Sequence, residues 1–96
     1  MNETFLLTIA GYGQAGNDLL IFPAMPADKY HFADLEKIRI VTPYNRGMER
    51  DAEFGIPFET PSVVYMLLIR NTQKDEVPVG SQLWVLKPLD QIERSP

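Results

Sequence analysis

A glycine-rich segment near the start of the chain has the spacing of a dinucleotide-binding motif. Gly11, Gly13 and Gly16 match G-x-G-x-x-G and follow a predicted strand. In a dinucleotide site these glycines allow a tight turn and let a phosphate approach the backbone amides at the start of a helix. Here the apolar run 19–22 ends at Pro23 and is too short for that helix. We therefore expect a glycine-rich hairpin loop with positive-φ positions, and we predict no cofactor.

The chain has a single histidine, His31, between Tyr30 and Phe32. Asp28 and Asp34 lie three residues to either side, so a carboxylate would orient the imidazole for general-base catalysis if the segment were helical. The alternative is a partly buried histidine in an aromatic cluster. No nucleophile stands beside it, and we predict no catalytic residue. The candidate residues of a ligand-binding loop are Gly11, Gly13, Gly16 and His31.

A second candidate region is the segment 43–61, which contains three prolines and two glycines. Loops longer than ~12–15 residues are uncommon in compact domains and often have a function. We predict a long surface loop with a short helix over 48–54, because Met, Glu, Arg and Ala favour helices. Its aromatic and arginine side chains belong to types enriched at interfaces. The candidate interaction residues are Tyr44, Arg46, Arg50 and Phe54. The alternative is a solvated loop that only connects two elements.

Composition excludes several kinds of site. The chain has no cysteine, which excludes disulfides, thiolate catalysis and zinc held by cysteines. One histidine cannot form a multi-histidine site, and we predict no metal site. Nine basic residues against thirteen acidic ones give a net charge of −4, which argues against nucleic-acid binding. Arg39, Tyr44, Arg46 and Arg50 could form a basic, aromatic patch for a single strand. The acidic residues of the same segment would repel phosphate.

The sequence gives no sign of a membrane or export segment. Residues 1–3 carry no basic side chain, and the apolar run 5–10 breaks at Gly11. No apolar stretch approaches the ~20 residues needed to cross a bilayer. We expect a soluble protein of the cytoplasm that does not contact a membrane.

Apolar periodicity predicts five strands, at 4–10, 18–22, 35–42, 62–70 and 82–87. The run 63–69 is apolar on both faces, which is typical of a central strand covered on both sides. In the last strand Trp84 and Leu86 lie opposite Leu83 and Val85. Short helical turns are expected at 28–33 and 89–94.

These elements predict one domain over residues 1–96, with a mainly β fold. The architecture we expect is a small five- to six-stranded barrel or a compact sandwich with one or two short helical turns. A barrel removes the exposed edges that a flat sheet of this size would leave.

The absence of a catalytic set favours a binding role. The first hypothesis is a non-catalytic interaction module that uses the segment 43–61 to bind a protein partner or a second copy as a homodimer. The second is a small-ligand or enzyme site at a barrel mouth, formed by the loop 11–16, His31 and the segment 43–61. The third is a small nucleic-acid-binding barrel.

Overall fold

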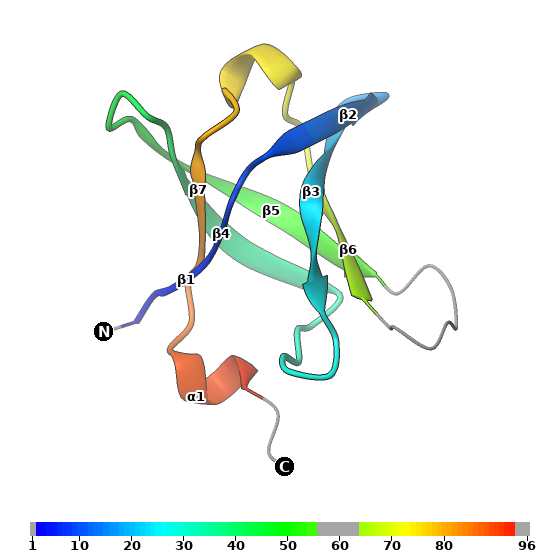
Figure 1. Cartoon of the computed structure of the whole chain (residues 1–96), viewed down its shortest axis with the longest axis vertical. Coiled ribbons are helices and arrows are strands. Elements are labelled where there is room, and N and C mark those ends of the chain that lie inside the picture. The colour runs from blue at the N-terminus through cyan, green and yellow to red at the C-terminus, as the bar shows by residue number, and fades with distance from the viewer. Residues whose placement is uncertain (1, 56–63, 94–96) are drawn as a thin grey trace.

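The computed structural model describes residues 2–55 and 64–93, and these residues are mainly β. Seven antiparallel strands form one sheet in the order β1–β7–β4–β5–β6–β3–β2 (Figure 1). This confirms the mainly β prediction. The strands are β1 (Thr4–Thr8), β2 (Gly11–Ala15), β3 (Asp18–Pro26), β4 (Leu35–Val41), β5 (Gly47–Gly55), β6 (Val64–Ile69) and β7 (Gln82–Val85). A 3-10 turn, η1 (Lys74–Glu76), precedes β7, and one helical turn, α1 (Leu89–Ile92), follows it.

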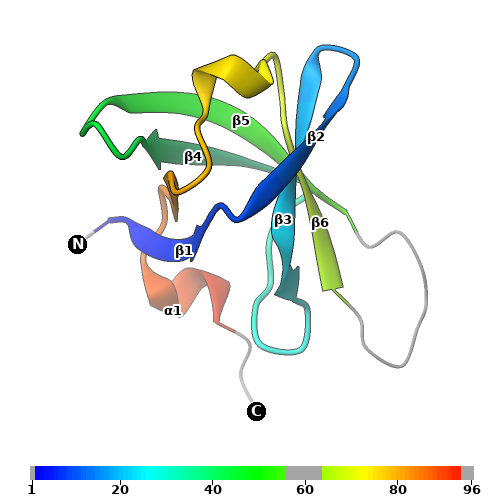
Figure 2. The ribbon, with the colours of Figure 1, turned by 45° about the horizontal axis from the view of Figure 1, so that its top comes forward.

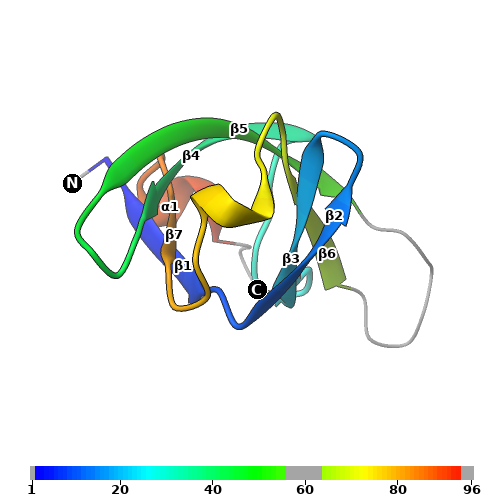
Figure 3. The same ribbon diagram turned by 90° about the horizontal axis from the view of Figure 1, so that it is seen from above.

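The sheet curls into a half-barrel around the core, as Figures 2 and 3 show. Its two edge strands, β1 and β2, are consecutive in the sequence and are joined by Ile9 and Ala10. The Ile9 amide donates to the Ser81 carbonyl beside β7 at 2.8 Å, and the Ala10 amide donates to the Phe22 carbonyl in β3 at 2.9 Å. The chain therefore passes directly from one edge of the curled sheet to the other.

Alternation of side chains explains which face of the sheet is covered. In β4, Ile38 and Ile40 are fully buried, while Lys37 and Arg39 lie on the outer face. Strand β6 lies between β5 and β3, which confirms the predicted central strand from Val64 onward. Residues 62 and 63 of that prediction lie outside the described residues. The largest fully buried apolar side chains of the core are Ile9, Leu19, Ile21, Ile38, Ile40, Leu67, Ile69, Val77, Leu83, Val85 and Ile92.

Strand β5 corrects the prediction of a long loop with a short helix over 43–61. Residues 47–55 are a strand, which pairs with β4 from Gly47 to Glu53. Buried Ala52 and Phe54 alternate with Asp51 and Glu53 on the outer face, which is the period of a strand. Packing of this alternating pattern overrides the helix propensity of the individual residues. The part of the predicted loop at 56–61 lies outside the described residues.

The glycine-rich segment also forms a shorter loop than expected, because most of it is a strand. Residues 11–15 form β2, which pairs with β3 from Gly11 with Phe22 to Ala15 with Asp18. The hairpin turn itself is Gly16 and Asn17, and Gly16 has a φ of 62°. A glycine at the first central position is typical of a tight two-residue hairpin turn. A hairpin with a positive-φ glycine is present, but it joins β2 to β3 and not the predicted strands 4–10 and 18–22, and no helix follows Gly16.

The two other predicted helical turns have different outcomes. Residues 27–29 form a turn and Tyr30 makes an isolated bridge with Glu93, so the segment 28–33 is not helical. The second, at 89–94, is helical over Leu89–Ile92. Neither helical segment of the described chain is long and apolar enough to cross a membrane.

Candidate binding groove

The β4–β5 hairpin and the residues around η1 enclose a groove at one end of the half-barrel. Its volume is about 410 Å³. This site, hereafter the groove, is lined by Thr42, Tyr44, Arg46, Met48, Asp75, Glu76 and Pro78. One wall therefore comes from the hairpin and the other from a segment about thirty residues later.

The turn of the hairpin is held in a defined shape. The Asn45 amide donates to the Thr42 carbonyl at 2.9 Å, and the Arg46 amide donates to the Thr42 hydroxyl at 3.1 Å. Asn45 has a φ of 61°, a conformation that asparagine tolerates better than most residues. This turn presents the Tyr44 side chain to solvent, where it is 80% exposed.

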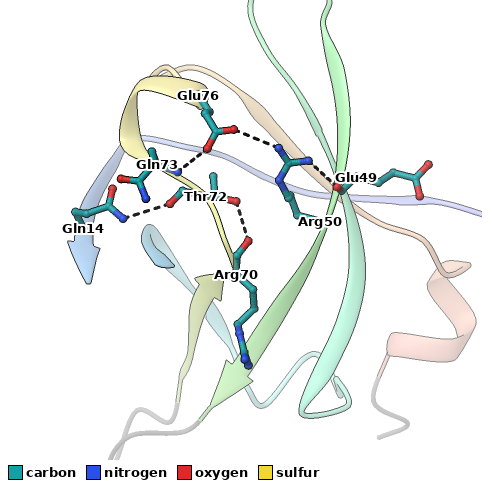
Figure 4. Close-up of polar contacts among 7 residues, drawn as sticks. All are labelled: Gln14, Glu49, Arg50, Arg70, Thr72, Gln73 and Glu76. Atoms are coloured by element: carbon teal, nitrogen blue, oxygen red, sulfur yellow. Dashed lines mark hydrogen bonds and ion pairs between the residues drawn. The ribbon is translucent and has the colours of Figure 1, made fainter. Parts of the chain in front are cut away.

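The opposite wall is fixed to the sheet by a polar network around Gln14 (Figure 4). The Gln14 side-chain amide donates to the Thr72 carbonyl at 3.2 Å, and its oxygen accepts from the Lys74 amide at 3.0 Å. It also donates to the carbonyls of Gly16 and Asp18 in its own hairpin. A single side chain thereby ties the β2–β3 hairpin to η1.

A second connection runs from η1 to β5. The Glu76 carboxylate accepts from the Gln73 amide at 2.7 Å and from the Arg50 guanidinium at 3.3 Å. The same guanidinium donates to the Glu49 carbonyl at 2.9 Å. Figure 4 shows Arg50 reaching across between β5 and the turn. Both side chains of the Arg50–Glu76 pair are about a third exposed, so its main effect is to position the two walls.

Charges in the groove are only partly compensated. Glu76 is paired with Arg50, but no ion pair joins Arg46 or Asp75 to another residue of the described chain. The floor is less polar, because Met48 packs against the core and Pro78 is half-buried. The groove thus offers an apolar base between a free guanidinium and a free carboxylate.

The structure separates the four predicted interaction residues. Tyr44 and Arg46 lie in the groove, and Arg50 lies beside it through its pair with Glu76. Phe54 is at the other end of β5 and only 3% exposed, stacked on Phe32 with 4.2 Å between ring centroids. The inward register of β5 puts Phe54 in the core, so its prediction as a surface contact is wrong.

The predicted ligand loop is not brought together. His31 is exposed, and its amide donates to the Ile92 carbonyl of α1 at 2.6 Å. Helix α1 lies at the bottom of Figure 1, whereas the β2–β3 turn that contains Gly16 is at the top. Gly11 and Gly13 are in β2, where an added Cβ would meet nothing within 4 Å. These glycines and His31 do not share a site.

Sequence reasoning missed the second wall of the groove. The sequence of residues 71–80 predicts a polar turn that returns to the sheet, and nothing in its composition indicates a contact with residues 42–48. The link depends on Gln14 and Arg50, which are far from η1 in the sequence. Of the described residues, no three His, Asp or Glu side chains are placed to hold a metal ion.

The outer face of the sheet carries a separate, partly exposed aromatic pair. Phe5 in β1 is 44% exposed and meets Trp84 of β7 edge to face, with ring centroids 5.4 Å apart. A shallow hollow of about 330 Å³ adjoins Trp84 and is lined by Glu3, Arg39, Val41 and Gln82 as well. Tyr65, by contrast, is in the core.

Comparison with known proteins gives no relative. No family model matches the sequence, and no match was found among the curated proteins or the solved structures.

Proposed function

We propose that this protein is an interaction module that binds a segment of a protein partner in the groove. The observation that carries the proposal is the exposure of Tyr44 on one wall of the groove, next to the unpaired guanidinium of Arg46. Tyrosine and arginine are enriched among the residues that dominate binding energy at interfaces. A tyrosine held on a fixed turn also loses little conformational entropy when a partner covers it.

The dimensions and chemistry of the groove suit a peptide segment. A volume of about 410 Å³ lies within the range of sites that accept small ligands or a few side chains. The floor formed by Met48 and Pro78 offers apolar contact, and a methionine adapts to side chains of different shape. Arg46 and Asp75 provide a donor and an acceptor on opposite walls.

Selection from a random library of twelve-residue peptides displayed on phage tests this proposal. Peptides enriched on the purified protein should share a pattern and should perturb the amide resonances of Met48 and Glu76. Their affinity should fall at least about tenfold in Tyr44→Ala, which is typical of a residue that dominates an interface. Phe22→Ala is the control, because Phe22 is an exposed aromatic residue of β3, outside the groove. Failure to enrich any peptide, or equal binding by both variants, would contradict the proposal.

Self-association is a second candidate, supported by the partly exposed Phe5–Trp84 pair. An apolar patch that stays exposed in one copy is often covered in an assembly. Sedimentation at increasing protein concentration should then reveal a dimer that Phe5→Ser dissociates and Tyr44→Ala does not. A monomer at all concentrations would exclude this candidate.

A further inference from the structure

Strand β5 has a partner on both sides only in its second half. It pairs with β4 from Gly47 to Glu53, but with β6 only from Ala52 to Gly55. Residues 47–50 therefore have one edge along which no strand of the described chain lies. An edge of this kind is a template for another extended chain.

The backbone groups of alternate residues point to this free edge. The Asp51 carbonyl accepts from the Arg70 amide at 2.9 Å on the β6 side, whereas the Phe54 amide donates to the Asp34 carbonyl on the β4 side. Because this direction alternates along a strand, Gly47 and Glu49 face the same way as Asp51. The Glu49 carbonyl is covered by the Arg50 guanidinium, and its amide remains available.

Hollows flank the free edge on both faces of the sheet. The groove lies on the inner face, where Met48 packs against the core. A second hollow of about 400 Å³, hereafter the outer hollow, is lined by Arg39, Gly47, Met48 and Glu49. A Cβ placed on Gly47 would lie 3.9 Å from the Arg39 side chain, which locates this hollow on the outer face. Successive side chains of an added strand point to opposite faces and would enter the two hollows in turn.

The charges beside the edge indicate what such a strand would carry. Glu49 borders the outer hollow and Asp75 borders the groove, and neither has an ion-pair partner in the described part of the chain. One carboxylate without an ion-pair partner therefore stands on each face of the edge. The groove also holds the unpaired guanidinium of Arg46, whereas the Arg39 guanidinium of the outer hollow is paired with Glu3. The whole chain has a net charge of −4, which adds a longer-range attraction for a cationic segment.

The geometry points to β-strand addition: we infer that an extended partner segment with basic side chains on both faces pairs with β5 along Gly47–Glu49. Its alternate side chains enter the groove and the outer hollow, next to Asp75 and Glu49. This inference rests on the proposed function and specifies its binding mode and class of partner. A second copy of this chain fits less well, because η1 is joined to β5 by Arg50 and Glu76 and stands beside the edge.

Backbone methylation of the bound peptide tests the binding mode. The probes are the peptides selected on the wild-type protein, resynthesised with one N-methyl group at each position in turn. In strand addition, alternate amides donate to β5, so methylation of one alternating set should weaken binding by about tenfold or more. Methylation of the intervening set should have little effect. Equal effects at all positions would overturn strand addition while leaving binding in the groove intact.

Two protein variants test the edge and the charges, and Glu49→Gln is the control for the carboxylate that Glu49→Pro also removes. Glu49→Pro removes an amide that points away from β4, so the β4–β5 pairing should persist while peptide binding falls at least about tenfold. In a second variant, Glu49→Lys combined with Asp75→Lys, selection should enrich acidic instead of basic peptides. Unchanged binding by folded Glu49→Pro would overturn strand addition, whereas a dimer of the wild type that this substitution dissolves would overturn the basic partner segment as the occupant of this edge. If Glu49→Pro fails to fold, the methylation series on the wild-type protein still tests strand addition. Absence of any selected peptide would overturn both this inference and the proposed function.

Discussion

The two ends of the half-barrel are built from opposite kinds of contact. At the end near α1, Phe32 stacks on Phe54 and meets Tyr65 edge to face at 5.2 Å, and all three are buried. At the groove end, η1 is joined to the sheet by Gln14 and by the Arg50–Glu76 pair, whose side chains are about a third exposed. Buried aromatic contact contributes several kcal/mol, whereas exposed ion pairs contribute about 0–1 kcal/mol each.

This difference separates stability from recognition. The aromatic end excludes water and fixes the chain, so its side chains are not available to a partner. The groove end keeps its walls in place through polar contacts that leave Tyr44 exposed and Arg46 unpaired. Substitutions at the two ends should therefore affect different measurements, unfolding at one end and binding at the other.

The largest effect is expected at the aromatic end, from Phe32→Ala. This change removes a ring that contacts Tyr30, Phe54 and Tyr65, and should lower the free energy of unfolding by about 3–5 kcal/mol. Phe5→Ala, at an exposed ring, is the control and should lower it by about 1 kcal/mol. Urea unfolding of both variants measures the difference. Equal losses would contradict the assignment of the stable core to this end.

Glu36→Ala should give the next largest decrease in the free energy of unfolding. The Glu36 side chain is 3% exposed, and its carboxylate accepts from the Ala33 amide at 2.7 Å and pairs with Lys87 at 2.9 Å. Its removal leaves an amide and an ammonium group without their partner, at an expected cost of about 1–3 kcal/mol. Lys87 is a third exposed and can be solvated by water, which limits the loss. Glu36→Gln keeps the shape and one acceptor, so it should lose less in the same urea experiment. A larger loss for Gln than for Ala would contradict this account.

At the groove end, Gln14→Ala should lower the free energy of unfolding by about 1 kcal/mol, because the hydrogen bonds of the Gln14 side chain are largely exposed. The main effect of this substitution should be a local change in hydrogen exchange. The Lys74 amide donates to Gln14, so hydrogen exchange at Lys74 should become faster in the variant while exchange in β6 is unchanged. Gln91→Ala on α1 is the control. Equal acceleration throughout the sheet would mean that the groove end and the core open together.

Sequence alone predicted β4, whose outward Lys37 and Arg39 alternate with inward Ile38 and Ile40, and β7, whose inward Leu83 and Val85 are apolar. It failed for β5, because Arg50 occupies an inward position and the residue types favour a helix. It also took β2 for a loop, since glycines are depleted in strands and β2 forms only by pairing with β3. One wall of the groove was predictable, because Tyr44 and Arg46 are of residue types that are enriched at interfaces. The other half depends on hydrogen bonds across the fold from Gln14 and Arg50, and no local pattern encodes them.

The smallest effect on stability is expected for Tyr44→Ala and Arg46→Ala. Both side chains are exposed, and neither side chain has a hydrogen bond or ion pair among the described residues, so the free energy of unfolding should change by less than about 0.5 kcal/mol. The melting temperature should therefore be nearly that of the wild type, while affinity for the selected peptides falls. Tyr44→Phe keeps the ring and should retain most of the binding, which separates ring contact from the hydroxyl group. A pair of measurements on each variant, thermal unfolding and peptide titration, gives the answer. Early unfolding of both alanine variants would assign the hairpin tip to structural packing, and unchanged binding would reduce it to a connection between β4 and β5.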